Sequence, residues 1–137
     1  MATKPSQALG QAMSLMNPPI PHTSSFVLTK EDVCGIHTTR GASGAVTFTL
    51  PAVTADITGA WVKFINAVDQ NMIVAAGTAD TLVVVNDLTA DSLAAQTSSQ
   101  KIGAVIECYC DGTAWFAWGT AVGAGGDTGT ATYTVAT

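Results

Sequence analysis

From Phe26 onward, the chain alternates between short apolar runs and breaks made of Gly, Asp, Asn and Thr. Apolar residues at every second position are typical of strands that bury one face and expose the other. The clearest case is the run 45–50, in which Val46, Phe48 and Leu50 share one face. The pattern predicts nine strands, near residues 25–29, 35–39, 45–50, 60–67, 71–76, 81–86, 103–110, 113–119 and 130–136.

Residues 87–100 do not follow this alternation. Leu88, Leu93 and Ala94 give them only weak helical periodicity, so we expect a loop with at most one helical turn. Many short strands joined by short turns are typical of all-β folds. The sequence therefore predicts a single β-sandwich or jelly-roll-like domain over residues 25–137.

The first 24 residues have a different character. Prolines at positions 18, 19 and 21 disfavour helix there and favour an extended chain. Before them, apolar residues recur at helical spacing. We interpret residues 1–24 as an extended N-terminal arm that binds a neighbouring chain, rather than as a disordered tail. The candidate contact residues of this arm are Leu9, Met13, Met16 and Ile20.

The strongest local signal is the pair Asp111-Gly112 between two apolar runs. Asp-Gly favours a two-residue hairpin turn, because both central positions of that turn need positive φ. We expect the face of the hairpin that contains Trp115 to lie in the core. The register predicted from this turn sets Cys110 opposite Thr113, Cys108 opposite Trp115 and Ile106 opposite Ala117.

The other face of the hairpin carries Tyr109, Phe116 and Trp118 beside Val105 and Glu107. Three aromatic rings around one carboxylate are too apolar for open solvent and too polar at their edge for a deep core. Aromatic residues are enriched in protein interfaces. Tyr109, Phe116 and Trp118 are therefore candidate interface residues.

The composition favours a protein that assembles. A chain of 137 residues, of which 47% are hydrophobic, can bury a core without disulfides or metals. Only 11% of its residues are charged, against roughly 25% in an ordinary soluble domain. Its 20 threonines suit exposed strand faces. Sparse charge is also typical of subunits that bury much of their surface against neighbours, so we favour a homo-oligomer over a monomer.

Charge and hydropathy also limit the partners. The net charge is −5, and the five cationic residues are scattered along the chain, which argues against nucleic acid as a partner. No segment approaches the ~20 consecutive apolar residues of a membrane-spanning helix. The N-terminus does not show the pattern of a signal peptide, so we expect synthesis in a cytoplasm, with reduced thiols.

The residues show no pattern typical of catalysis. His22 and His37 stand apart in the sequence, and no Cys or His cluster has metal-ligand spacing, so we expect neither metal nor cofactor. Cys108 and Cys110 point the same way along a strand, which favours free buried thiols over a bridge between them; a bridge from Cys34 to either is the alternative. No Ser-centred nucleophile elbow occurs, and the glycine-rich stretch lacks the lysine of a phosphate loop. We therefore expect a structural or binding protein rather than an enzyme.

Three segments resemble small β domains of tailed-bacteriophage virion proteins. One is the strand with its following proline at residues 44–52, and another is the apolar strand at residues 61–67. The third and most specific is the hairpin at residues 104–116, with its Asp-Gly-Thr-x-Trp motif. The resemblance covers about residues 26–119. The cysteines of the hairpin depart from the usual pattern.

That family includes head decoration (cement) proteins, head fibres and modules of tail fibres. Among these, the resemblance and the single-domain length favour a cement subunit on the capsid surface, which binds the major capsid protein and stabilises joints between capsomers. Similar cement subunits are commonly trimers, so we expect a homotrimer. The alternative is a receptor- or glycan-binding fibre module, in which Tyr109 and Trp118 would stack on sugars.

Overall fold

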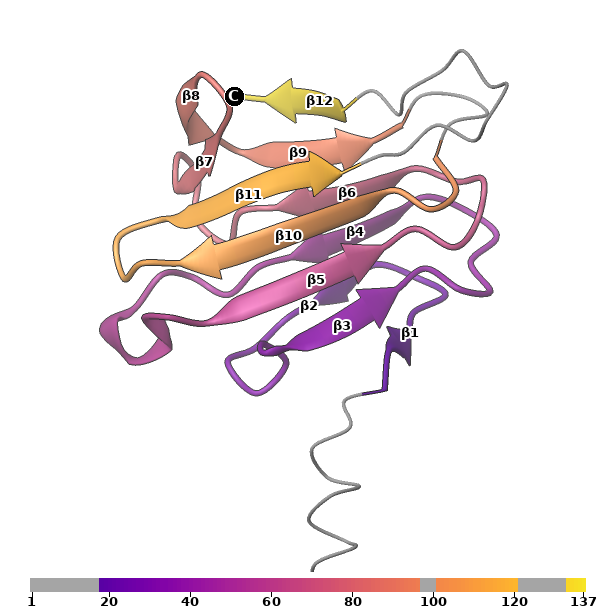
Figure 1. The fold of residues 1–137 in the computed structure, drawn as a ribbon, viewed down its shortest axis with the longest axis horizontal. Coiled ribbons are helices and arrows are strands. Elements are labelled where there is room, and N and C mark those ends of the chain that lie inside the picture. Colours follow the sequence, from indigo (N-terminus) through magenta and orange to yellow (C-terminus); the bar gives the residue numbers. More distant parts are fainter. Residues whose placement is uncertain (1–17, 97–100, 121–132) are drawn as a thin grey trace, which may run out of the picture.

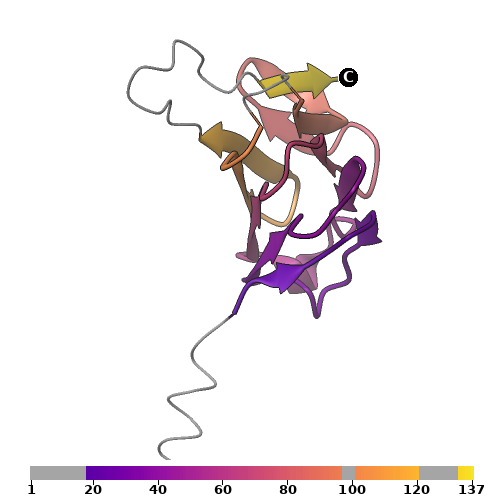
Figure 2. The same ribbon diagram turned by 90° about the vertical axis from the view of Figure 1, so that its right-hand side faces the viewer.

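The computed structural model describes residues 18–96, 101–120 and 133–137. Within these ranges the chain forms twelve strands and one short 3-10 helix, η1 (Ala55–Ile57). The strands form two sheets that pack face to face, as the views in Figures 1 and 2 show. The predicted all-β fold is confirmed, and its form is a β-sandwich.

The larger sheet has seven strands in the order β1-β3-β5-β10-β11-β7-β8, and the smaller has five in the order β12-β9-β6-β4-β2. The bounds in the larger sheet are β1 (Ile20–Pro21), β3 (Gly35–Thr38), β5 (Trp61–Ile65), β7 (Leu82–Val84), β8 (Asp87–Ala90), β10 (Val105–Cys110) and β11 (Trp115–Thr120). Those in the smaller sheet are β2 (Phe26–Val27), β4 (Val46–Thr49), β6 (Met72–Ala75), β9 (Ser92–Ala95) and β12 (Tyr133–Ala136).

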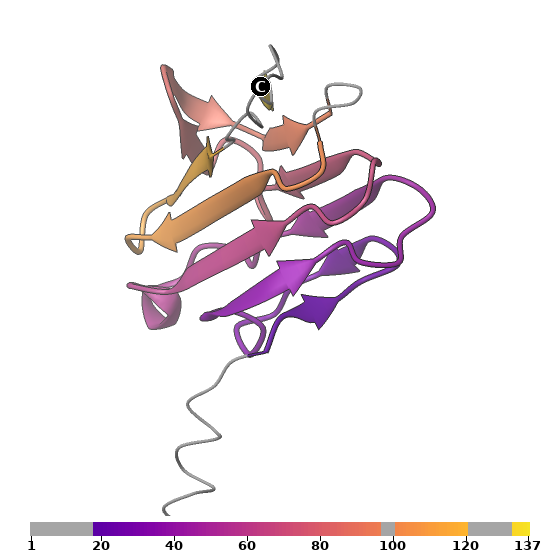
Figure 3. The same cartoon turned by 45° about the vertical axis from the view of Figure 1, so that its right-hand side comes forward.

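The first six strands change sheet at every step. Therefore β1, β3 and β5 are neighbours in the larger sheet, whereas β2, β4 and β6 are neighbours in the smaller one, and all four of these neighbour pairs are parallel. Figure 3 shows the chain passing back and forth between the two layers. Antiparallel pairing begins where β5 meets β10 and continues through the hairpin β10–β11.

Each of the nine predicted strands coincides with a strand of the structure, but the loop expected at residues 87–100 is wrong. Strands β8 and β9 occupy its described part. The turn before β8 contains Asn86, whose φ of 62° is left-handed, a conformation that Asn adopts more readily than most residues. Leu93 and the alanines that follow it in β9 are buried, so their packing overrides the weak strand propensity of alanine.

The hairpin register predicted from Asp111-Gly112 is also wrong, by two residues. Cys110 pairs with Trp115 rather than Thr113, and the whole ladder shifts with it. Only Gly112 has positive φ in this turn, whereas a two-residue turn of the predicted type needs two such positions. The Asp111 carboxylate instead accepts the backbone N–H groups of Thr113 and Ala114, both at 2.8 Å, which gives a four-residue loop. A shift of two keeps every side chain on its face, so the predicted faces are correct.

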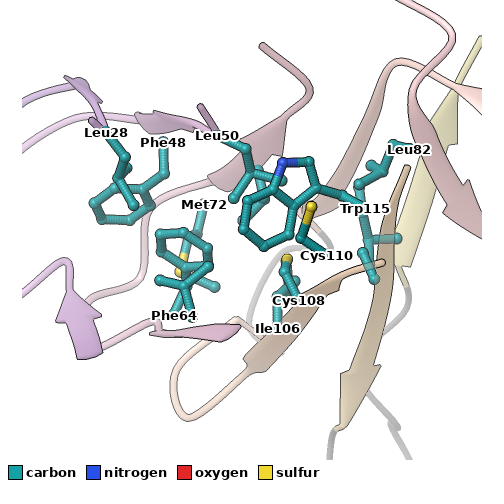
Figure 4. Packing of buried hydrophobic residues seen from close by; sticks show 14 of the residues in the cluster. Leu28, Phe48, Leu50, Phe64, Met72, Leu82, Ile106, Cys108, Cys110 and Trp115 are labelled. Atoms are coloured by element: carbon teal, nitrogen blue, oxygen red, sulfur yellow. The ribbon is translucent and has the colours of Figure 1, made fainter. Parts of the chain in front are cut away.

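The core lies between the sheets. Phe48 of β4 and Phe64 of β5 meet at its centre with their ring centroids 4.7 Å apart, and both are fully buried (Figure 4). Trp115 is fully buried as predicted, and its indole N–H donates to the Pro51 carbonyl oxygen at 2.9 Å. Figure 4 shows Ile106, Cys108 and Cys110 facing the same interior.

Cys108 and Cys110 are buried free thiols, as expected from their strand positions. Burial raises the pKa of the Cys108 thiol far above its usual range, and the neighbouring Glu107 carboxylate raises it further. This thiol therefore stays protonated at neutral pH. The thiolate is the reactive form of cysteine, so Cys108 acts as a small apolar core residue.

The two histidines are not isolated from each other, contrary to the expectation from the sequence. His22 follows β1, and its ring lies 2.9 Å from the ring of His37 on β3, measured between His22 Nε2 and His37 Nδ1. Since β1 is hydrogen-bonded to β3, part of the segment assigned to the N-terminal arm, residues 1–24, is docked on the domain. Residues 1–17 lie outside the described part of the chain.

We expect Trp115→Ala to lower the free energy of unfolding by about 3–5 kcal/mol, because neighbours of a large buried ring cannot fill the cavity. Urea unfolding followed by circular dichroism measures this loss. Trp118→Ala is the matched control, since Trp118 lies on the outward side of the same strand and its replacement should cost much less. A loss below about 1 kcal/mol for Trp115→Ala would contradict its place in the core.

Candidate interaction surface

The outer face of the seven-stranded sheet carries a row of apolar side chains. The row contains one residue from each of four neighbouring strands, paired in register: Trp61 of β5, Tyr109 of β10, Phe116 of β11 and Val83 of β7. The alternation that turns Val62 and Phe64 into the core necessarily turns the intervening side chains outward. Tyr109 is 44% exposed and Phe116 is 40% exposed. These rings are therefore available to another molecule.

A second row lies beside the first and contains Lys63, Glu107 and Trp118. The Lys63 ammonium and the Glu107 carboxylate form an ion pair with an N–O distance of 2.9 Å. The ring of Trp118, which is 40% exposed, stacks on the ring of Tyr109 with a centroid distance of 5.2 Å and an angle of 10°. The two opposite charges cancel, so this ion pair adds no net charge beside the rings. We call Trp61, Val83, Tyr109, Phe116 and Trp118 the aromatic face.

A shallow groove of about 470 Å³ borders the aromatic face at β7. Its lining residues are Val83, Val84, Val85, Tyr109, Phe116, Ala117 and Trp118. Val85, in the turn between β7 and β8, extends this apolar rim and is 78% exposed. Only the Tyr109 hydroxyl and the Trp118 indole N–H offer side-chain hydrogen bonds in the lining. Such a groove suits an aliphatic or aromatic side chain better than a polar ligand.

The size of the aromatic face can be compared with that of known interfaces. An aromatic side chain buries about 150–250 Å², so three rings that are about 40% exposed leave roughly 240 Å² in solvent. With the exposed Val85 at the rim, the patch approaches the ~300–600 Å² of the largest apolar patches on monomers, which are often functional. A stable interface buries about 800 Å² per partner, so the aromatic face would form its centre rather than its whole area.

The structure brings together three of the seven interface residues predicted from the sequence: Tyr109, Phe116 and Trp118. Ile20 lies on β1, at the far edge of the same sheet from β7 and β8, and is 47% exposed. The remaining candidates, Leu9, Met13 and Met16, lie outside the described residues. Whether any of the seven contacts a partner stays a prediction.

Trp61, Val83 and Val85 also belong to this surface, although the sequence pattern did not point to them. The alternation in the run 61–65 already set Trp61 on the face opposite Phe64. The sequence did not indicate that β5 pairs with β10, and this pairing is what places Trp61 beside Tyr109. The parallel pairing of β7 with β11 likewise brings Val83 beside Phe116.

Among the described residues, no three His, Cys, Asp or Glu side chains are grouped as a metal ion would require. In that same part of the chain, no helix has the length and apolar character needed to cross a bilayer. No family model matches the chain, and no curated protein matches it.

Replacement of two aromatic rings on this face should weaken assembly without unfolding the domain. We expect Phe116→Ser with Trp118→Ser to convert the oligomer to smaller species while the domain stays folded, because both rings lie outside the core. Light scattering at micromolar concentration measures the first effect, and circular dichroism measures the second.

The matched control is Val27→Ser with Ile102→Ser, which removes apolar residues that are 67% and 68% exposed but lie off the aromatic face. The control should keep the mass of the wild type. A wild-type chain that is monomeric, or a double variant of the aromatic face with unchanged mass, would contradict the proposed interface.

Proposed function

We propose that this chain is a non-enzymatic structural subunit of a tailed-phage virion, which decorates the head and stabilises joints between capsomers. The observation that carries the proposal is the aromatic face, an exposed apolar surface on a rigid sheet. The resemblance of residues 26–119 to virion β domains supports the same assignment. The partners under this proposal are the major capsid protein and further copies of the chain, most simply in a trimer.

The proposed mechanism requires only that apolar surface of the subunit is buried against the capsid. A subunit that binds the assembled capsid, and not its separated parts, stabilises the assembled state by mass action. The aromatic face supplies apolar area at about 25 cal/mol per Å² buried, and its one ion pair is already satisfied within the subunit. Several such faces in one oligomer would bind neighbouring capsomers together, so that modest contacts add up through avidity.

A receptor- or glycan-binding module is the second candidate. The stacked and exposed rings of Tyr109 and Trp118 favour it, because sugars bind through stacking on aromatic rings. Sugar recognition also requires polar groups placed to bind hydroxyls. The groove beside these rings offers few, so a protein partner fits the lining better.

The number of copies on purified particles distinguishes the two candidates. A decoration subunit should be present in a number comparable to that of capsomers, and its loss should make heads less resistant to heat. A fibre or adhesin module should be present in a few copies, and its loss should reduce attachment to host cells instead. Quantitative mass spectrometry of virions measures the copy number, and a low value would contradict the proposed head decoration.

Deletion of residues 2–17 tests the contribution of the N-terminal segment. It spares β1, so the domain should remain folded and oligomeric. Burial of three apolar side chains gains about 1.5–3 kcal/mol each, and ordering about four residues around them, at about 1–2 kcal/mol each, offsets most of it. We therefore expect affinity for particles to fall by about tenfold, which corresponds to a net loss near 1.4 kcal/mol.

The readout for this deletion is the occupancy of particles as a function of added protein. A matched internal control replaces only the four residues Leu9, Met13, Leu15 and Met16 with serine, which keeps the length of the segment. Occupancy equal to the wild type in both variants would show that the segment takes no part in attachment.

A further inference from the structure

The hydrogen bonds of the histidine pair assign its tautomers. His37 is 1% exposed, and its Nε2 lies 2.8 Å from the backbone carbonyl oxygen of Asp32. A carbonyl oxygen can only accept, so His37 Nε2 carries a hydrogen. In neutral His37 the other nitrogen, Nδ1, must then accept, and it does so from the Nε2–H of His22 at 2.9 Å. In the neutral pair, therefore, His22 Nε2 donates across the contact and His37 Nδ1 carries no proton.

The ring of His22 holds β1 against the domain. It packs on Phe26 with a centroid distance of 4.4 Å and meets Phe48 edge-on at 5.2 Å. The backbone N–H of His22 donates to the Thr38 carbonyl oxygen at 2.8 Å, which extends the ladder between β1 and β3. That ladder pairs only Ile20 with His37 and Pro21 with Thr38. Since β1 is so short, the His22 contacts form a large part of its attachment.

Added protons act on this arrangement in two steps. The first proton enters at Nδ1 of His22, the ring nitrogen that takes no part in the contacts described above, and one hydrogen still joins the two rings. It sets a positive charge among aromatic rings. A second proton would enter at Nδ1 of His37 and remove the acceptor, so that two N–H groups would face each other across 2.9 Å. The docked geometry cannot accommodate that state.

The surroundings of His22 disfavour its charged form. Burial lowers the pKa of His22, the proximity of His37 lowers it further, and the Asp32 carboxylate opposes both effects. That carboxylate also accepts the Thr29 backbone N–H at 2.7 Å. From β2, β4 and β5 the pair faces the rings of Phe26, Phe48 and Phe64, which supply no charge.

The sign of the pH effect follows from this. A histidine in the released segment titrates near its ordinary value of about 6.5, above that of docked His22. Below that pH the released state therefore binds more protons than the docked state. The attachment of β1 is at full strength above pH 6.5 and weakens as the pH falls through the window between the two pKa values.

We propose that His22 and His37 form a pH-dependent latch, which holds β1 on the sheet at neutral pH and releases it on acidification. Release would add residues 18–24 to the N-terminal segment, and seven extended residues span about 23 Å. The latch would thus set how far this segment reaches from the domain. It rests on the contacts and the surroundings of the pair and holds whether or not the protein decorates a capsid.

Nuclear magnetic resonance of the whole chain tests the latch. The chain has only two histidines, so every histidine ring signal belongs to the pair. Ring nitrogen shifts at pH 7.5 should show the Nε2–H tautomer for both. Between pH 7 and 5, the hydrogen-exchange protection factor of the His22 amide should fall several-fold, while that of Val62 in β5 stays constant. The lower limit of pH 5 remains above the ordinary titration range of Asp and Glu.

The variant His22→Gln provides the matched control. Its amide can donate to His37 Nδ1 but does not titrate, so protection of the residue 22 amide should not depend on pH over the same range. Protection of the wild-type amide that is constant from pH 7 to 5 would overturn the proposal. So would an equal loss in His22→Gln, since a group other than His22 would then be responsible. Loss of Val62 protection in parallel would also overturn it, because the transition would be global unfolding.

Discussion

The contact between Phe48 and Phe64 joins the two sheets, and the rest of the structure depends on it. The two rings come from β4 and β5, which follow each other in the chain but belong to different sheets. Because the first six strands change sheet at every step, each inward side chain meets one from the opposite layer. Close packing between these side chains fixes the position of the sheets relative to each other. A second core element, Trp115, is tied to the loop after β4 through its hydrogen bond to Pro51.

The same alternation that fills the core produces the aromatic face. Every residue of β5, β10 and β11 that does not point inward must point outward, and in these strands the outward positions include Trp61, Tyr109, Phe116 and Trp118. Core packing does not explain these residues, because none of them is fully buried. Their outward position is what a subunit that binds another protein requires. The ion pair between Lys63 and Glu107 carries no net charge, so contacts of the rings beside it would depend on apolar burial more than on charge.

Alternation within the chain was enough to predict the nine strands and the two faces of the hairpin. It could not specify which strands pair, because parallel neighbours such as β3 and β5 are separated by another strand in the opposite sheet. For this reason the sequence did not bring His22 to His37 or Trp61 to Tyr109. The predicted hairpin register was wrong for a local reason. The Asp111 carboxylate accepts hydrogen bonds from two backbone N–H groups of the loop, and in a shorter turn these groups would have paired across the two strands. The sequence did not predict strand β9 because alanine has a weak intrinsic strand propensity, and burial of the alanines in the core is what favours the strand.

The short ladder of β1 has a consequence for how the domain responds to force. A pull on the N-terminal segment reaches the domain at β1, which holds on to the sheet through two paired residues and the contacts of His22. The strands behind it are longer and bury their side chains in the core. Tension would therefore peel β1 away before it strained β3 or β5. The domain could lengthen its attachment under force by the residues of β1 while its core and its aromatic face remained intact.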